Sequence, residues 1–333
     1  MIIQAILSWY QQHGRKNLPW QNKSDYHVWI SEIMLQQTQV IKVIDYFERF
    51  IRRFPTLKQL AQADEETVLA HWSGLGYYNR ARNIHKTASI CMQEYAAKLP
   101  KNLKDLMQLP GIGRTTAGAI LSLGSNRPFP IMDGNVKRFY SRLFAIKAEK
   151  NSLFEKKLWE KAEALIPKDF GRNYNQALMD IGSIVCTPRN PHCENCPVQK
   201  QCKAYHRNEI ELYPQKNKAT RQVPQSLHLL LLIDNNKVYL EKIQTTIWKH
   251  LWFLPQLDSK NYWLKSIKKP STPLFSIQHL LSHRKLTLNI YTSQISSLKP
   301  LAEKGQWIDL SSYQEQPHPS ALVKILSHFS LHC

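Results

Sequence analysis

Apolar residues recur with helical spacing through the first two thirds of the chain. Between residues 40 and 54 they follow one another mostly at steps of three and one, the pattern of an amphipathic helix with one buried face. Pro55 should end that helix, because proline cannot continue it. The same pattern predicts helices over 83–95, 115–123, 135–144, 154–165 and 174–185. Turn sequences separate these stretches, so we predict a helical bundle with short connections.

The pattern changes after residue 206. Residues 207–225 are polar, contain two prolines and show no period, which is typical of a linker. Beyond the linker, residues 226–243 predict a hairpin that turns at Asn235 and Asn236, because asparagine tolerates positive φ. Alternation over 285–295 predicts a strand, and 318–329 predicts a closing helix. We therefore expect a helical domain over 1–206 and an α+β domain over 226–333.

The charge of the chain indicates a large anionic partner. The formal net charge is +20, from 45 Lys and Arg against 25 Asp and Glu. Nucleic acid is favoured over an anionic membrane surface, and a solvated basic surface without a polyanion is the alternative. No run of about 18 apolar residues occurs, and the first residues lack the pattern of a signal peptide. We therefore expect a cytoplasmic protein that does not enter membranes.

The cysteines are unevenly distributed. Four of the six lie in one short stretch with the spacing C-x6-C-x2-C-x5-C: Cys186, Cys193, Cys196 and Cys202. This clustering favours a metal site in a reducing compartment over a disulfide framework. The spacing alone leaves zinc and an iron–sulfur cluster both open.

The stretch LPGIGRTTAGAI, residues 109–120, places two glycines one residue apart before a predicted helix. It matches neither a dinucleotide-binding loop nor a P-loop, because Arg114, Thr115 and Thr116 follow the second glycine. This turn is therefore expected to bind something other than a free nucleotide.

Several motifs together resemble a known family. The cysteine spacing, LPGIGRTTAGAI and PIMDGNVKRF resemble the helix-hairpin-helix DNA glycosylases of the endonuclease III type. More narrowly, LPWQ, SEIMLQQTQV, GLGYYNRARN and DGNVKR are similar to the A/G-specific adenine DNA glycosylases, which remove adenine mispaired with 8-oxoguanine. The resemblance covers the helical domain almost without gaps. The second domain resembles the Nudix-like C-terminal domain of that family more loosely.

The resemblance implies a fold, a cofactor and a partner. The fold is a mainly α helix-hairpin-helix glycosylase domain with a cluster loop at 186–202, followed by an α+β Nudix-like lesion-recognition domain. The four cysteines of that loop would hold one [4Fe-4S] cluster. The partner would be double-stranded DNA with an 8-oxoguanine·adenine mispair, with guanine or cytosine opposite adenine as further candidates. The enzyme would be a monomer in the bacterial cytoplasm, associated with the nucleoid.

The resemblance also explains the paired glycines. In a helix-hairpin-helix, Leu109, Gly111 and Gly113 would form the hairpin, and Thr115 would lie in the helix that follows. The glycines let backbone amides approach a DNA phosphate, and the helix N-terminus adds a favourable dipole. Such contacts position a duplex without reading its bases. An ordinary packed helical hairpin is the alternative.

Cleavage of an adenine N-glycosidic bond needs an acid for the departing base and a negative charge near the sugar. Glu32 lies among apolar residues that should raise the pKa of its carboxyl group. The resemblance assigns it protonation of adenine at N7 and later activation of water. The alternative for Glu32 is a first-turn glutamate that favours the helix dipole. Asp133 is expected to cap a helix, and the resemblance places it near the cationic sugar, supported by Asn135.

Recognition residues follow from the resemblance alone. Gln37 and Tyr77 match residues that wedge into the duplex around 8-oxoguanine, although an exposed helix amide and a core tyrosine are the simpler interpretations. Residues of the expected adenine pocket are Trp20, Leu35, Gln36, Thr38 and Gln176. In the second domain the family carries a Phe-Ser-His loop that reads the lesion. Here the positions hold Leu281, Ser282 and His283, so the aromatic residue is missing.

Thr115 separates two enzyme classes. In the strand-cleaving relatives a lysine at this place forms a Schiff base with the sugar, which a threonine hydroxyl cannot do. We therefore expect a monofunctional glycosylase that leaves an intact abasic site. The alternatives are an endonuclease III-like lyase acting on oxidised pyrimidines and a cluster-containing DNA-binding protein without catalysis. A Nudix hydrolase is disfavoured because the acidic residues after 225 are not clustered as its metal signature requires.

Overall fold

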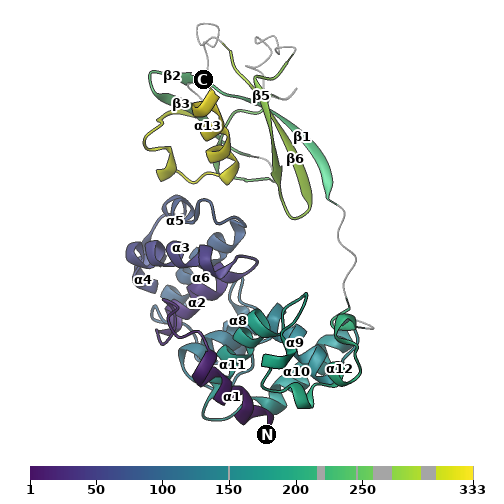
Figure 1. Cartoon of the computed structure of the whole chain (residues 1–333). Coiled ribbons are helices and arrows are strands. Elements are labelled where there is room, and N and C mark those ends of the chain that lie inside the picture. Colours follow the sequence, from purple (N-terminus) through teal and green to yellow (C-terminus); the bar gives the residue numbers. More distant parts are fainter. Residues whose placement is uncertain (149–150, 216–221, 245–246, 258–271, 294–304, 333) are drawn as a thin grey trace. The chain divides into compact units, whose positions relative to one another are not determined.

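The structure is a computed structural model that describes residues 1–148, 151–215, 222–244, 247–257, 272–293 and 305–332 (Figure 1). The chain divides into two compact units. The first comprises Met1–Gln62 and Asn83–Asn217, and the second comprises Ala63–Arg82 and Lys218–Cys333. The passage between them near residue 217 falls in the expected linker, whose residues 216–221 lie outside the described part. No helix among the described residues is both long and apolar enough to cross a membrane.

The first unit is helical. Its elements are α1 (Ile2–His13), α2 (Asp25–Leu35), α3 (Val40–Arg53), α4 (Leu57–Gln62), most of α6 (Asn79–Glu94), α7 (Leu103–Gln108), α8 (Arg114–Ala119), η1 (Ile120–Gly124), α9 (Gly134–Phe144), α10 (Asn151–Leu165), α11 (Gly171–Asp180), η2 (Ile181–Val185), η3 (Cys193–Asn195), η4 (Gln199–Gln201), α12 (Lys203–His206) and η5 (Ile210–Leu212). The predicted helices are confirmed to within a few residues, with two differences. Both η1 and η2 are π-helical turns that end α8 and α11, where the sequence predicted continuous helices.

The core of the first unit lies between helices that are distant in sequence. Helices α1 and α9 both pack against α11 (Figure 1). Tyr140 of α9 and Tyr174 of α11 are fully buried, and their hydroxyls lie 3.4 Å apart. Helix α3 buries Val43, Phe47 and Phe50, the face that its apolar spacing predicts. Burying a side chain of this size typically stabilises a fold by about 1.5–3 kcal/mol.

Helices α7 and α8 form the predicted hairpin. Leu109 and Ile112 between them are each 4% exposed and anchor the turn in the core. Gly111 has φ of 77°, a left-handed conformation that glycine adopts without strain. Gly113 caps α8, and a Cβ at that position would meet no atom within 4 Å. The hairpin therefore presents an open backbone at the start of α8.

The second unit combines helices with two sheets. Its elements are α5 (Glu65–Trp72), β1 (Val223–Leu230), β2 (Ile233–Asp234), β3 (Lys237–Lys242), β4 (Trp252–Phe253), β5 (Phe275–Leu280), β6 (Arg284–Tyr291), β7 (Gly305–Asp309), η9 (Tyr313–Glu315) and α13 (Ser320–His332). One sheet has the order β1-β6-β5, with β1 parallel and β5 antiparallel to β6. The other has the order β2-β3-β4, with β7 also paired to β3. Alternate residues of β6, namely Leu286, Leu288 and Ile290, are fully buried in a core that α13 shares.

The predicted α+β class, the strand over 285–295 and the closing helix are confirmed as far as they are described, since residues 294–295 lie outside the described part. The predicted hairpin exists between β2 and β3, where Asn235 and Asn236 have φ of 45° and 62°. Its first strand was predicted too long. Residues 223–230 pair instead with β6, because their buried leucines complete the other sheet.

Candidate active site

A pocket of about 320 Å³ opens in the first unit beside α11 and the loop between α1 and α2. Its walls are formed by Tyr10, Gln11, Lys16, Trp20, Gln21, Asn22, Val28, Leu123, Arg172, Asn173 and Gln176. Two of the residues expected to form the adenine pocket, Trp20 and Gln176, thus line one pocket. Leu35 and Thr38, at the end of α2, are half-buried but do not line this pocket, and Gln36 beside them is exposed.

Glu32 lies in the last turn of α2 and not in its first. The alternative of a first-turn glutamate is therefore wrong, because the helix begins at Asp25. The C-terminal end of a helix carries partial negative charge, which disfavours a carboxylate there. Burial, followed by the charge of Asp133, raises the pKa of Glu32 to about 8. The predicted direction of this pKa shift is confirmed, and the carboxyl group is largely protonated at neutral pH.

Asp133 caps the N-terminus of α9, as predicted. Its Oδ1 accepts the Val136 N–H at 2.8 Å, and its Oδ2 accepts from Asn135 Nδ2 at 3.1 Å. Burial raises the pKa of Asp133, while these hydrogen bonds and the charge of Arg138 act to lower it. The charge of Asp133 in turn raises the pKa of Glu32, so the two carboxyl groups belong to one site.

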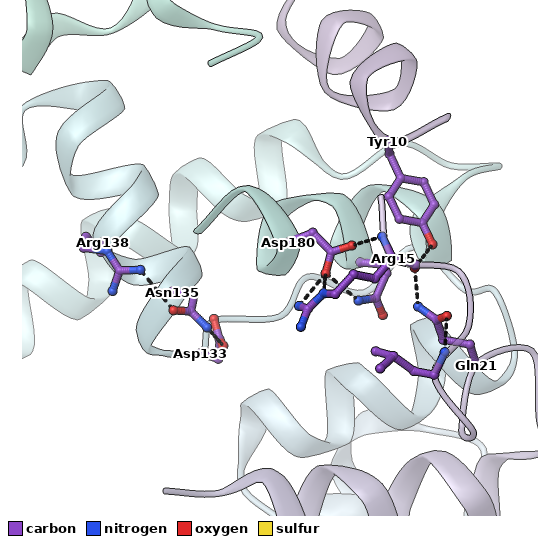
Figure 2. A network of polar contacts seen from close by, with 9 residues as sticks. Tyr10, Arg15, Gln21, Asp133, Asn135, Arg138 and Asp180 are labelled. Carbon is purple, nitrogen blue, oxygen red and sulfur yellow. Dashed lines mark hydrogen bonds and ion pairs between the residues drawn. The ribbon is translucent and has the colours of Figure 1, made fainter. Parts of the chain in front are cut away.

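Arg138 is hydrogen-bonded to Asn135, the residue that contacts Asp133 (Figure 2). Its Nη2 donates to Asn135 Oδ1 at 3.0 Å and also to the Gly182 carbonyl. Its Nε donates to the carbonyl oxygen of Cys186 at 2.7 Å. A continuous chain of hydrogen bonds thus joins Asp133 to the first cysteine of the loop. Arg138 was not among the site residues predicted from the sequence, although its spacing of three from Asn135 places both on one helix face.

A second polar network, centred on Asp180, includes Gln21 and Gln176 of the pocket wall (Figure 2). The carboxylate of Asp180 is fully buried and accepts from Arg15 at three nitrogens, the backbone N and Nε at 2.8 Å and Nη2 at 2.6 Å. Gln176 Nε2 donates to the same carboxylate at 3.0 Å, and Gln21 Nε2 donates to the Arg15 carbonyl at 2.8 Å. The amide orientation of Gln176 in the pocket is therefore fixed.

The cysteine loop surrounds a cavity lined by all four cysteines and by apolar residues including Phe139, Leu143, Val185 and Val198. Burial, assisted by neighbouring charges, raises the pKa of Cys193 and Cys202 and brings that of Cys196 to about 12. Across the described ranges, no group of three or more His, Cys, Asp or Glu side chains is arranged to hold a single metal ion. Arg142 Nη1 lies 3.4 Å from the sulfur of Cys186. Four thiols in an apolar cavity suit a cluster of several metal ions that stabilises their thiolate forms.

The expected duplex-wedging residues lie on exposed loops. Gln37 in the first unit and Tyr77 in the second have φ of 57° and 52°, left-handed conformations that are uncommon outside glycine. Tyr77 is 47% exposed, so the interpretation as a core tyrosine is wrong. In the second unit, Ser282 and His283 form the centre of the turn between β5 and β6, and the Ser282 hydroxyl lies 2.5 Å from the Tyr77 hydroxyl. Leu281 packs against the core of this unit.

Thr115 lies in the first turn of α8, close to the catalytic candidates. Its hydroxyl donates to the carbonyl oxygen of Met132, the residue before Asp133, at 3.2 Å. Thr115 thus lies beside Asp133.

Comparison with known proteins identifies the family. Residues 30–164 match the HhH-GPD superfamily base excision DNA repair protein, 186–202 match the iron-sulfur binding domain of endonuclease III, and 228–328 match a NUDIX domain. The adenine DNA glycosylase of Buchnera aphidicola subsp. Schizaphis graminum is 41% identical over 98% of this chain and 98% of its own length. The chain belongs to the adenine DNA glycosylases.

Other adenine DNA glycosylases and related folds agree with this assignment. The adenine DNA glycosylase of Mus musculus is 45% identical over 61% of this chain and 41% of its own length. The solved structure of a thermostable thymine-DNA glycosylase superposes with a TM-score of 0.56 and 28% identity, over 62% of this chain and 95% of that protein. This adenine DNA glycosylase is a base excision repair enzyme, and its cysteine loop holds a [4Fe-4S] cluster, which excludes the zinc alternative.

Proposed function

We propose that this adenine DNA glycosylase hydrolyses adenine from 8-oxoguanine·adenine mispairs in duplex DNA and leaves an intact abasic site. The proposal is carried by the buried carboxyl group of Glu32, whose pKa is raised to about 8 by burial and by the nearby charge of Asp133, the residue that caps α9. The enzyme acts as a monomer in the bacterial cytoplasm, on the DNA of the nucleoid.

Glu32 acts as the acid and then as the base. An adenine taken out of the helix stack enters the pocket beside Trp20 and Gln176. Glu32 transfers its proton to the adenine ring as the bond between the sugar and the base breaks, so that the base leaves without negative charge. The resulting carboxylate accepts a proton from the water that attacks the sugar, which restores the acid form.

Asp133 stabilises the cationic sugar. Its orientation is fixed by the Val136 N–H and by Asn135, so its charge is in place before the sugar becomes positive. Thr115 beside it has no amine with which to attack the sugar, so water is the nucleophile. Cys186, Cys193, Cys196 and Cys202 would hold the [4Fe-4S] cluster, which would fix the loop by binding their thiolates. Arg138 donates hydrogen bonds both to that loop and to Asn135, so the position of the loop helps to fix the position of Asn135.

Lesion recognition comes from Gln37, Tyr77, Ser282 and His283. Their support is the exposed, left-handed conformation of Gln37 and Tyr77 and the pairing of the Tyr77 and Ser282 hydroxyls. Because Leu281 replaces the aromatic residue of the family loop, hydrogen bonding from the turn supplies the discrimination in its place. The exposed hairpin around Gly111 and Gly113 grips a phosphate of the same duplex.

The experiment uses purified protein and end-labelled duplexes with adenine opposite 8-oxoguanine, guanine or thymine. Base loss should be fastest opposite 8-oxoguanine, and strand breaks should appear only after hot alkali. Borohydride should trap little covalent protein–DNA adduct. Adduct formation that keeps pace with adenine release would show lyase chemistry instead, and equal rates on all three duplexes would contradict recognition of the lesion.

A further inference from the structure

Tyr77 projects from a tightly bent loop between α5 and α6 in the second unit. Within this loop Gly74, Gly76 and Tyr77 have φ of 89°, 80° and 52°. Two of these are glycines, but a tyrosine in this conformation brings its Cβ close to the backbone and is strained. Such a conformation persists only where surrounding contacts hold it. A neighbouring residue must therefore hold Tyr77 in this conformation.

Arg80, on the first turn of α6, contacts the loop in three ways. Its side chain is buried, with only 9% of the residue exposed. Its guanidinium carbon lies 5.3 Å from the ring centroid of Trp72 and 5.3 Å from that of Tyr77. Its Nη2 donates to the carbonyl oxygen of Gly76 at 3.1 Å, and Trp72 Nε1 donates to the same oxygen at 3.0 Å. Arg80 therefore fixes both the peptide before Tyr77 and the ring of Tyr77.

A guanidinium group can contact the ring of Tyr77 and the carbonyl oxygen of Gly76 at the same time. Burial lowers the pKa of Arg80 to about 10, so the group remains charged at neutral pH. A cation over an aromatic ring is attracted by the ring quadrupole, more strongly where water is excluded. A planar guanidinium can stack on a ring and donate from its edge at the same time, which the ammonium group of lysine cannot do. The Tyr77 hydroxyl meets Ser282 at the far end of the ring, so that contact does not replace this one.

We propose that Arg80 is a positioning residue that holds Tyr77 in its left-handed conformation before DNA binds. This inference rests on the proposed role of Tyr77 in lesion recognition. A side chain that is ordered in advance avoids the entropy loss of ordering on binding. Arg80 takes no part in bond cleavage, so its loss weakens binding of the lesion without slowing the chemical step in the bound complex.

The test uses the full-length variants Arg80→Met, Arg80→Lys, Tyr77→Ala and the double variant Tyr77→Ala with Arg80→Met. Dissociation constants are measured on duplexes that carry a non-cleavable adenine analogue opposite 8-oxoguanine or guanine. Arg80→Met should weaken binding of the 8-oxoguanine duplex about tenfold and reduce its preference over guanine. Arg80→Lys should resemble Arg80→Met, because the charge alone does not stack. The single-turnover rate at saturating enzyme should stay unchanged.

The double variant makes the test specific. Arg80→Met should add nothing to Tyr77→Ala, because both changes remove the same ordered side chain. Arg82→Met is the matched control, since Arg82 lies on the same helix but contacts Glu65, Asn79 and the Lys249 carbonyl, and it should bind like the wild type. Arg80→Gln replaces the methionine variant if that variant melts early. Additive losses, or wild-type binding by Arg80→Met, would overturn the proposal for Arg80. Wild-type binding by Tyr77→Ala alone would instead overturn the role of Tyr77 in the proposed function.

Discussion

At the scale of single residues, the site depends on where α2 places one carboxyl group. Glu32 is buried near the C-terminal end of α2, and burial first, then the charge of Asp133, favours its protonated form. An exposed glutamate would be ionised at neutral pH and could not donate a proton. The environment of Glu32 therefore determines its chemical role.

The pH dependence of the excision rate follows from this shift. Because the pKa of Glu32 is raised to about 8, the active acid form predominates below that pH and is lost above it. The single-turnover rate should be flat near neutrality and fall about tenfold per pH unit beyond about pH 8. Glu32→Gln should bind DNA but lose roughly 100- to 10,000-fold in rate near neutral pH, and its rate should not fall further as the pH rises through 8. A wild-type rate that stays constant to well above pH 8, or a Gln variant close to wild type, would exclude Glu32 as the acid.

At the scale of elements, α9 links the catalytic candidates to the cysteine loop. Asp133 caps this helix, while Asn135 and Arg138 follow on its first turns and reach the Cys186 carbonyl. A rigid helix fixes these groups relative to one another better than a loop would.

Replacing Arg138 tests this link. Arg138→Met should leave the Asn135 amide without its donor, so that Asp133 loses a fixed orientation, and the excision rate should fall at least about tenfold. The neighbouring Lys137→Met is the control, because Lys137 pairs with Glu155 and not with the site. Single-turnover rates, measured alongside the iron content, distinguish a misplaced Asp133 from a lost cluster. Equal rates for the two variants would show that the link has no catalytic role.

The helices also differ in how well the sequence predicted them. Helices with one apolar face, such as α3, were predicted well, because their period reports their burial. Helix α2, which carries Glu32, was not among the predicted helices. Its own side chains, such as Trp29, Ile30 and Met34, are buried on several sides of the helix, so its apolar residues show little helical period. The pattern of apolar residues did not predict the π-helical turns η1 and η2 either. Arg138 and Asp180 were missed because lone charged residues look solvent-exposed until their partners are known.

At the scale of the whole molecule, the cluster is a structural element of the first unit. The protein as purified should be brown and contain about four irons per chain, one for each thiolate. Cys202→Ser should lose the colour and lower the yield of folded protein, because the three remaining thiols do not replace the fourth ligand. Iron analysis and the visible spectrum check this outcome. Stoichiometric zinc without iron, in protein isolated anaerobically, would contradict it.

The ion pair between Arg15 and Asp180 joins positions 165 residues apart in the chain and has consequences for how this sequence can change over time. Replacing Arg15 alone leaves the fully buried carboxylate of Asp180 without its ion-pair partner, at a typical cost of about 3–5 kcal/mol, a large part of the stability of an ordinary domain. Replacing Asp180 alone costs less, because the side chain of Arg15 is 30% exposed and reaches water. A sequence that loses Arg15 first is therefore strongly destabilised, whereas one that loses Asp180 first is less affected. Changes at the two codons are therefore ordered in time: descendants that lack Arg15 should also lack Asp180, whereas Asp180 can change first.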